Sequence, residues 1–232
     1  MDKQLIRLLR PVAVREIIEL HPRFTRVVVG GDAVGWFSHA RPAAWVKVFF
    51  TPPGEPEGFG RAYTISKMDA QSQTLCLDFV HHDAGPAIDW LKHARCGDIL
   101  RIAGPRDGLE TGEFSSLLLF GDETAIPAIC AILAELEEHA HARVILVGNV
   151  SDYSLPTCRC ELNLTRLDLH DDTLFSLVME SVEHLKPDII WGAGEYSDVV
   201  PLRQALLRSG RSRKNCDITA YWKLGQSDHR DD

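Results

Sequence analysis

The residues Ser116-Leu117-Leu118-Leu119-Phe120 form a nearly continuous apolar run at the point where the sequence changes its pattern. An apolar run of this kind, without alternation, is typical of a strand buried on both faces of a sheet. Downstream of it, amphipathic segments alternate with further apolar runs. We expect helices at 123–138, 172–184 and 199–209, and strands at 144–147, 164–169, 189–191 and 218–222. Alternating strands and helices predict a mainly parallel sheet covered by helices on both faces.

Upstream of residue 110 the sequence instead has the period of two that is typical of half-buried strands. Turn sequences such as Pro52-Pro53-Gly54 and Gly104-Pro105 separate the short runs. We expect strands at 26–30, 44–50, 61–66, 74–81 and 98–103. Five or six short strands at this spacing predict an antiparallel barrel or sandwich. One helix is expected within it, from Pro86 to about Ala94, because Pro suits a first helical turn.

The composition is that of an ordinary globular protein. The chain has 232 residues, 45% of them hydrophobic and 25% charged, a length that suits two domains. Its apolar runs are far too short to cross a bilayer, which takes about 20 residues. The start, Met1-Asp2-Lys3-Gln4, has no apolar signal core, so we expect a cytoplasmic protein. A net charge of −8 argues against nucleic acid as a partner.

The cysteines do not predict a metal centre. There are six, and Cys158-Arg159-Cys160 is the only close pair. A single C-x-C pair supplies at most two ligands, and no second pair follows at the spacing of a zinc site or an iron–sulfur cluster. We therefore expect reduced thiols and no metal bound by the protein itself.

The first segment that carries chemistry is Arg61-Ala62-Tyr63-Thr64-Ile65, which brings a guanidinium, an aromatic ring and a hydroxyl together on one expected strand. Arg61 and Tyr63 share a face because strand side chains alternate. On that face the guanidinium can hold a phosphate while the ring lies against a planar ring system. The alternative is an exposed Arg beside a half-buried Tyr without a ligand.

The second segment runs from Asp78 to Ala87 and leads into the expected helix, within which Trp90 follows. Gly85 lets a ligand approach the backbone. The free N–H groups at the start of a helix are a suitable seat for a pyrophosphate. His82 can stack on an adenine or hydrogen-bond a ribose, or serve a structural role.

Two further segments place small residues at the ends of expected buried strands. Gly121-Asp122-Glu123-Thr124-Ala125 opens a helix, and Thr124 can cap that helix or meet a phosphate. Trp191-Gly192-Ala193-Gly194-Glu195 has the same placement. Ligands gather at the carboxyl ends of strands in such sheets, although single glycines also mark tight turns.

These four segments, in this order, resemble the siderophore-interacting protein family of bacterial ferric-siderophore reductases. The similarity runs from about Val14 to Gly225 and closes on Tyr221-Trp222-Lys223-Leu224-Gly225. The Arg-x-Tyr-Thr element is shared with the wider ferredoxin-reductase-like flavoproteins, whereas the other segments are more specific to this family. The resemblance implies an FAD-binding β-barrel domain over 1–110 and an NAD(P)-binding-like α/β domain over 111–232. It also implies FAD-dependent reduction of siderophore-bound Fe(III) to Fe(II).

By position, the resemblance also implies which residues contact FAD. Arg61, Tyr63 and Thr64 would hold the isoalloxazine, ribityl and phosphate region. His82 and the Gly85-Pro86-Ala87 turn would take the adenosine and pyrophosphate end. The full expected set is Arg61, Tyr63, Thr64, Ile65, Asp78, Val80, His82, Gly85, Pro86, Ala87, Trp90, Thr124 and Ala125.

The resemblance further implies a basic site for the substrate. The family binds anionic ferric-siderophores at basic side chains beside the flavin, and the matching positions here are Lys47, Arg106 and Lys223. On a negatively charged chain such a cluster would steer anionic substrates; three solvated side chains are the alternative. One position departs from the family: Ser66 stands where a second Arg often follows Arg-x-Tyr-Thr-x, so we expect one phosphate contact to be missing.

Two other functions remain open at this point. One is a general NAD(P)H–flavin oxidoreductase of the ferredoxin-reductase type, and the other is a non-catalytic cytosolic siderophore-binding protein. The electron donor is expected to be NAD(P)H or reduced ferredoxin. An acid in the segment 148–152, with no Arg before Arg159, favours a ribose 2′-hydroxyl over a 2′-phosphate. The class of siderophore is not indicated.

Overall fold

The computed structural model describes residues 8–50, 58, 60–82, 85–110, 112, 114–148, 153–168 and 173–226. The chain divides into two compact units, Met1–Glu110 and Thr111–Asp232. Each unit has a hydrophobic core of its own. Within the described ranges, no helix is both long enough and apolar enough to span a bilayer.

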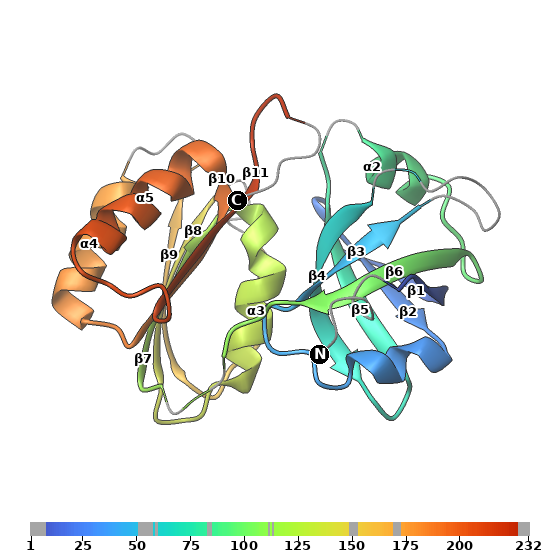
Figure 1. Cartoon of the computed structure of the whole chain (residues 1–232), viewed down its shortest axis with the longest axis horizontal. Helices are drawn as coiled ribbons and strands as arrows, with labels where there is room; N and C mark the ends of the chain where they lie inside the picture. Colours follow the sequence, from blue (N-terminus) through green and yellow to red (C-terminus); the bar gives the residue numbers. More distant parts are fainter. Residues whose placement is uncertain are drawn as a thin grey trace. The chain divides into compact units, whose positions relative to one another are not determined.

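The first unit is a closed six-stranded barrel with the strand order β1-β2-β5-β4-β3-β6 (Figure 1). All neighbouring strands are antiparallel, so the predicted antiparallel barrel is confirmed. Closure pairs every strand on both sides and leaves no free sheet edge. The strands are β1 (Arg10–His21), β2 (Phe24–Gly30), β3 (Trp45–Phe49), β4 (Arg61–Asp69), β5 (Thr74–Val80) and β6 (Ile99–Arg106).

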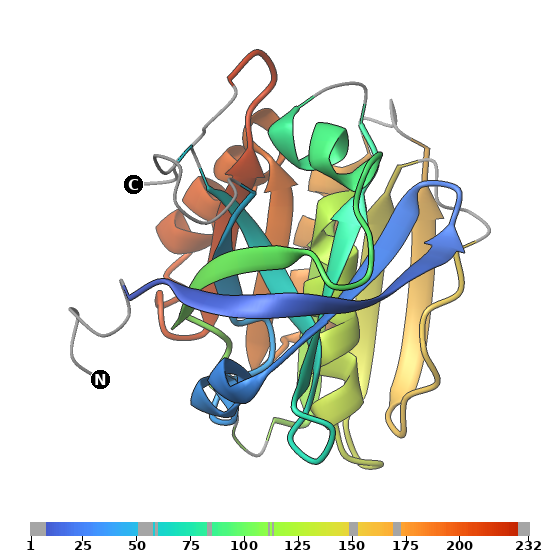
Figure 2. The ribbon, with the colours of Figure 1, turned by 90° about the vertical axis from the view of Figure 1, so that its right-hand side faces the viewer.

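Strand β1 is the element that the sequence pattern does not predict. Its register with β2 shifts between Val14 and Glu16 and again between Glu19 and His21. Each irregularity interrupts the alternation of inward and outward side chains, so the period of two holds from Arg10 to Val14 and is lost over the rest of the strand. Figure 2 shows β1, at the dark blue end of the scale, running across the barrel.

One short helix, α2 (Pro86–Leu91), packs on the barrel core through Ala87, Trp90 and Leu91. It ends three residues before the predicted Ala94, because Lys92 and His93 already lie in a turn. A 3₁₀ helix, Asp32–Phe37, adds Val34 and Phe37 to the same core.

The second unit is a five-stranded parallel sheet with the order β11-β10-β7-β8-β9. Figure 1 shows α3 on one face and α4 and α5 on the other, which confirms the predicted parallel α/β arrangement. The strands are β7 (Ser116–Gly121), β8 (His141–Val147), β9 (Glu161–Leu167), β10 (Ile189–Glu195) and β11 (Cys216–Trp222). The helices are α3 (Ile126–Glu135), α4 (Leu174–Leu185) and α5 (Tyr196–Arg208).

The predicted helix over 123–138 is wrong at both ends. Glu123–Ala125 forms a 3₁₀ turn, because the Asp122 side chain holds the N–H of Thr124 before the α-helix begins. Leu136 is extended and buried, which ends α3 at Glu135. The predicted strand over 164–169 ends at Leu169, and the predicted helix over 172–184 begins at Asp172. Both of these residues lie outside the described residues.

Two glycines let the carboxyl ends of β7 and β10 approach closely. A Cβ on Gly121 would lie 2.0 Å from the Ala193 carbonyl oxygen, and Gly121 has a φ of +158°. A Cβ on Gly194, with a φ of +155°, would lie 2.9 Å from Asp122 Oδ2. Any side chain at either position would push the ends of β7 and β10 apart. The two glycines are therefore needed for the close contact between these strand ends.

Candidate functional site

Arg61 and Tyr63 lie on one side of β4, as the strand alternation predicts. The register pairs them with Val48 and Val46 of β3, whose side chains are in the barrel core. Both therefore point to the inner side of the barrel wall, and both are half-buried. Burial raises the pKa of the Tyr63 hydroxyl well above its usual range, and the Arg61 charge offsets only part of the rise. Tyr63 thus stays a neutral phenol next to a cation.

The Tyr63 ring is the centre of an aromatic cluster. It stacks on Phe79 with ring centroids 4.1 Å apart, and Phe50 meets it edge-on at 6.2 Å. Trp90 from α2 lies 5.4 Å from Phe50 and 6.0 Å from Phe79. Two residues expected to contact FAD, Tyr63 and Trp90, therefore belong to one packed group. Its ring contacts fix the orientation of Tyr63.

The turn before α2 leaves room for a ligand to approach the backbone closely. Gly85 is the N-cap, with a φ of +145°, and no side chain caps the helix. Because a positive φ of this size favours glycine, a side chain here is disfavoured. His82 is exposed beside the turn, whereas His81 bonds to Thr25 Oγ1 at 2.8 Å and to the Pro22 carbonyl at 3.0 Å. His81 is the structural histidine, and His82 is the one available to a ligand.

FAD, the cofactor that the resemblance implies, fits these residues. A phosphate suits the Arg61 guanidinium, and a planar ring system suits the neighbouring aromatic cluster. The uncapped N–H groups after Gly85 suit a pyrophosphate oxygen, and the bare glycine allows its approach. Since α2 has only six residues, these N–H groups matter more than a helix dipole.

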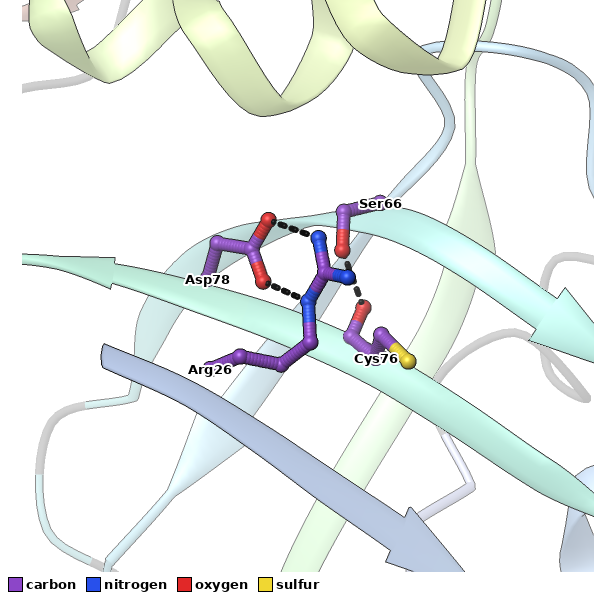
Figure 3. A network of polar contacts seen from close by, with 4 residues as sticks. All are labelled: Arg26, Ser66, Cys76 and Asp78. Atoms are coloured by element: carbon purple, nitrogen blue, oxygen red, sulfur yellow. Dashed lines mark hydrogen bonds and ion pairs between the residues drawn. The ribbon is translucent and has the colours of Figure 1, made fainter. Parts of the chain in front are cut away.

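Asp78, another expected FAD contact, is held by an arginine from β2. Arg26 donates through Nε and Nη2 to the two Asp78 oxygens at 2.7 and 2.8 Å. The Asp78 side chain is 2% exposed and that of Arg26 is 25% exposed. Ser66, where a second Arg was expected from the family, donates to the Cys76 carbonyl at 3.1 Å beside this pair (Figure 3). Arg26 is thus a cation beside Ser66, and Asp78 balances its charge.

Three other predicted contacts on the barrel have little side-chain surface to offer. Ile65 is part of the core, and Thr64 is 8% exposed. Ala87 is 3% exposed and packs on the core, so a ligand could meet only its backbone. Val80 is half-buried.

Lys47 and Arg106 lie near each other on the outer side of the β3–β6 pair. Lys47 is opposite Ala103, and Arg106 is opposite Trp45, two residues before Lys47. The Arg106 guanidinium lies 5.2 Å above the Trp45 ring, which Asp107 fixes by accepting from Trp45 Nε1 at 2.9 Å. Within the described ranges, neither cation forms an ion pair. This part of the barrel therefore carries two cations that form no ion pair with a described carboxylate.

In the second unit, Asp122 organises the carboxyl end of the sheet. Its Oδ1 accepts from the Thr124 N–H at 2.8 Å and the Thr124 hydroxyl at 2.5 Å. Its Oδ2 accepts from the Glu195 N–H at 2.9 Å and from Trp222 Nε1 at 2.7 Å. Burial raises the pKa of the Asp122 carboxyl, and these bonds from Thr124, Trp222 and Glu195 lower it in part. One carboxylate thus ties together β7, β10 and β11.

This network engages the predicted residue Thr124, whose hydroxyl proton points to Asp122 and not to a ligand. Ala125 is completely buried. The sequence prediction missed Asp122 and Trp222 as a pair. The signal available was an acid directly after one parallel strand and a Trp at the end of another, because such ends meet at one edge of the sheet.

Glu195 and Lys223 continue the same edge. Burial raises the pKa of the Glu195 carboxyl, but hydrogen bonds from Ser197 and from the N–H of Leu224 outweigh it, and the net shift is downward. The Leu224 N–H donates to Glu195 Oε1 at 3.0 Å and holds the chain after β11. The predicted substrate residue Lys223 is half-buried, with Nζ 4.4 Å above the Tyr196 ring.

The Asp122 network gives a first prediction. Asp122→Asn should lower the free energy of unfolding by about 2–3 kcal/mol, because an amide group would replace one oxygen that accepts two hydrogen bonds. Urea denaturation measures the change.

Asp188→Asn is the matched control, with an expected loss below about 1 kcal/mol. Asp188 accepts all its bonds from Ser115 and Ser116 through Oδ2, and one amide oxygen can replace that atom. Equal losses in the two variants would contradict the role of the network.

No group of three or more His, Cys, Asp or Glu side chains in the described part of the chain is arranged to hold a metal ion.

Comparison with known families covers both units. The model of the siderophore-interacting FAD-binding domain matches residues 51–109, and the model of the siderophore-interacting protein matches residues 114–225. The first matched range contains Arg61, Tyr63 and Gly85, and the second contains Asp122 and Lys223.

Individual proteins agree with these matches. The chain is 26% identical to the ferric acinetobactin reductase of Acinetobacter baumannii, over 83% of this chain and 73% of that protein. It is 27% identical to the NADPH-dependent ferric-chelate reductase of Escherichia coli K12, over 92% of each. A siderophore utilization protein from T. fusca shares the fold, with a TM-score of 0.82, 24% identity and coverage of 97% of this chain and 96% of that one. The chain therefore belongs to the siderophore-interacting protein family.

Proposed function

We propose that this protein is an FAD-dependent ferric-siderophore reductase, which reduces siderophore-bound Fe(III) to Fe(II) and so releases iron in the cytoplasm. The observation that carries the proposal is the FAD-binding family match over 51–109, on the residues that form the Arg61–Tyr63 pair and the Gly85 turn. The ferric reductases among the relatives support the choice of substrate.

The chemistry suits the substrate. Siderophores hold Fe(III), a hard cation, through oxygen donors, and they bind Fe(II) far more weakly, so one electron loosens the chelate. Bound FAD supplies this chemistry, because it accepts two electrons together and passes them on one at a time. The protein then needs to bind the cofactor, orient it and attract the chelate.

Within this proposal, the barrel at 1–110 is the FAD-binding domain and the α/β unit at 111–232 is the nucleotide-binding-like domain. Arg61 holds a phosphate, and Tyr63 presents its ring to the flavin. His82, Gly85 and Pro86 keep the roles that the resemblance gave them, and Ala87 acts through its backbone. Asp122 acts as a positioning residue, since it fixes Thr124 and Trp222 at the edge of the sheet.

Lys47 and Arg106 on the barrel are the proposed contacts for an anionic ferric-siderophore, and the resemblance gives Lys223 of the second unit the same role. Two features support it: Lys47 and Arg106 lie on the neighbouring strands β3 and β6, and no described carboxylate forms an ion pair with either. On a protein of net charge −8, unbalanced cations would concentrate an anionic ligand locally.

A second prediction tests this basic site. Lys47→Glu should weaken the binding of an anionic ferric-siderophore about tenfold, equivalent to about 1.4 kcal/mol. The loss should shrink as salt rises, because exposed charges are screened beyond about 8 Å at physiological ionic strength. The FAD content and the flavin spectrum should not change. Lys223→Glu should show the same selectivity if it belongs to this site.

Lys67→Glu is the matched control for Lys47→Glu, since Lys67 is an exposed lysine of the same barrel. It should leave siderophore binding unchanged. A neutral ferric chelate should bind both variants equally well. Equal losses for anionic and neutral chelates would show that Lys47 acts through folding or flavin geometry, and the basic site would be refuted.

The electron donor is proposed to be NAD(P)H or reduced ferredoxin. The name of the Escherichia coli relative makes NADPH the first donor to test. The acid that favoured a 2′-hydroxyl, Asp152, lies outside the described residues.

The visible spectrum of the purified protein is the experiment that tests the proposed function and identifies the donor. A flavin spectrum that bleaches with NADH, NADPH or reduced ferredoxin identifies the donor. A protein that takes up no FAD yet binds ferric-siderophores would be a carrier, and the proposed function would be wrong.

A further inference from the structure

The two thiols of the Cys158-Arg159-Cys160 segment are in contact. Cys160 Sγ donates to Cys158 Sγ at 3.4 Å, and a bend at Arg159 and Cys160 folds the chain to bring them together. None of the six cysteines, all of which lie in the described part of the chain, forms a disulfide. The proposed reductase function uses neither residue.

Contacts on both sides of Cys160 hold it in place. Arg159 forms an ion pair with Glu137 at 2.9 Å. The Glu161 N–H donates to the Ala140 carbonyl at 3.0 Å, and its carboxylate meets His141 Nδ1 at 2.9 Å. Cys160 is thus fixed directly before β9, an edge strand of the sheet. Cys158 instead lies in the irregular segment before it, where its Sγ donates to the Cys160 carbonyl at 3.7 Å.

The two thiols differ in their environment. Cys160 is 6% exposed, and Cys158 is half-buried. Burial, together with the hydrogen bond and charge of Cys158, raises the pKa of the Cys160 thiol to about 12. Cys160 therefore stays protonated, and its S–H group donates a hydrogen bond to Cys158 Sγ. Cys158 is the more exposed of the two residues, so an oxidant in solution meets it first, and the thiolate form of a cysteine is the nucleophile in disulfide exchange.

We propose that Cys158 and Cys160 form a reversible dithiol–disulfide site, which low-molecular-weight disulfides such as oxidised glutathione convert to an intramolecular disulfide. The Cys158 thiolate attacks one glutathione sulfur and expels the other as a thiolate. Cys160 then loses its proton, attacks Cys158 Sγ and expels the second glutathione thiolate. The two protein thiols are oxidised by two electrons, and one glutathione disulfide is reduced to two thiols.

The geometry allows the second step. A disulfide needs the sulfurs about 2.05 Å apart and the Cα atoms about 4.4–6.8 Å apart. Residues two positions apart span at most about 7 Å when fully extended, and the bend shortens that span. Because the second thiol is already in contact with the first, the mixed disulfide should close faster than a second glutathione molecule can react.

The test uses the full-length protein with its FAD, treated with oxidised glutathione, quenched in acid and alkylated. Digestion must avoid a protease that cuts after arginine, because Arg159 separates the two cysteines. We expect the peptide with Cys158 and Cys160 to lose two hydrogens, to carry no alkyl group and to regain both thiols with dithiothreitol. The exposed Cys96 is the internal control and should carry glutathione.

Two variants assign the roles. Cys160→Ser should trap glutathione on Cys158, and Cys158→Ser should leave Cys160 reduced under the same conditions. Three outcomes would overturn the proposal. The first is wild-type protein that retains glutathione on Cys158 and forms no disulfide with Cys160. The second is that both thiols remain open to alkylation while Cys96 is modified. The third is a disulfide that joins two chains and disappears when the protein is diluted before oxidation.

Discussion

Arg26→Ala should lower the free energy of unfolding by about 3 kcal/mol, the low end of the loss typical for breaking a buried ion pair. The Asp78 side chain is 2% exposed, so its charge would remain buried without the two bonds that Arg26 donates. The low end applies because Arg26 is itself 25% exposed and its own hydration is partly retained. Denaturation in urea, followed by circular dichroism, measures the change.

The double variant Arg26→Met, Asp78→Leu is the control for this prediction. It removes both charges and keeps side-chain volume, so it should be more stable than Arg26→Ala alone. A double variant that is as unstable as the single one would show that packing by Arg26, and not the ion pair, stabilises this side of the barrel. A single variant of wild-type stability would contradict the importance of the pair altogether.

Arg61→Ala should raise the dissociation constant for FAD about tenfold to hundredfold. A charge-assisted hydrogen bond to a phosphate is typically worth about 1.5–3 kcal/mol, and about 1.4 kcal/mol corresponds to a factor of ten. Titration of the flavin-free protein with FAD, followed by flavin fluorescence, measures the change. The expected loss is in affinity, with little effect on stability, since Arg61 lies at a half-buried position.

Arg15→Ala is the control for Arg61→Ala, because Arg15 is an exposed arginine on β1 of the same barrel. It should bind FAD as wild type does. An Arg61→Ala protein that is purified with full FAD, and retains it on dilution, would remove Arg61 from the cofactor site. The Tyr63 cluster and the Gly85 turn would then have to account for affinity without it.

The sequence predicted those parts of the fold whose pattern is local. The short apolar strands of the parallel sheet and the alternating strands of the barrel all exist, because burial on one or both faces dictates their composition. Strand β1 was missed because two register irregularities interrupt its alternation. The end of α3 was placed too late, because Leu136 leaves the helix to become buried in an extended conformation.

The site was predictable only where its residues are close in sequence. Arg61 and Tyr63 share a strand, and Gly85 and Pro86 are consecutive residues at the start of α2, so the structure places each pair together as expected. Asp78 instead meets Arg26, 52 positions away, and Asp122 meets Trp222, 100 positions away. Strand order and register decide those partners, and no short segment contains that information.

The central claim is that this protein transfers electrons from FAD to siderophore-bound iron. The most direct test is to reduce the FAD-loaded protein without oxygen, mix it with a ferric-siderophore and trap Fe(II) with ferrozine. We expect about two Fe(II) per bound FAD as the flavin band returns, since the cofactor carries two electrons. An equal concentration of free reduced FAD is the control and should react more slowly. A reduced protein that only oxygen reoxidises, or that produces Fe(II) no faster than free FAD, would contradict the claim.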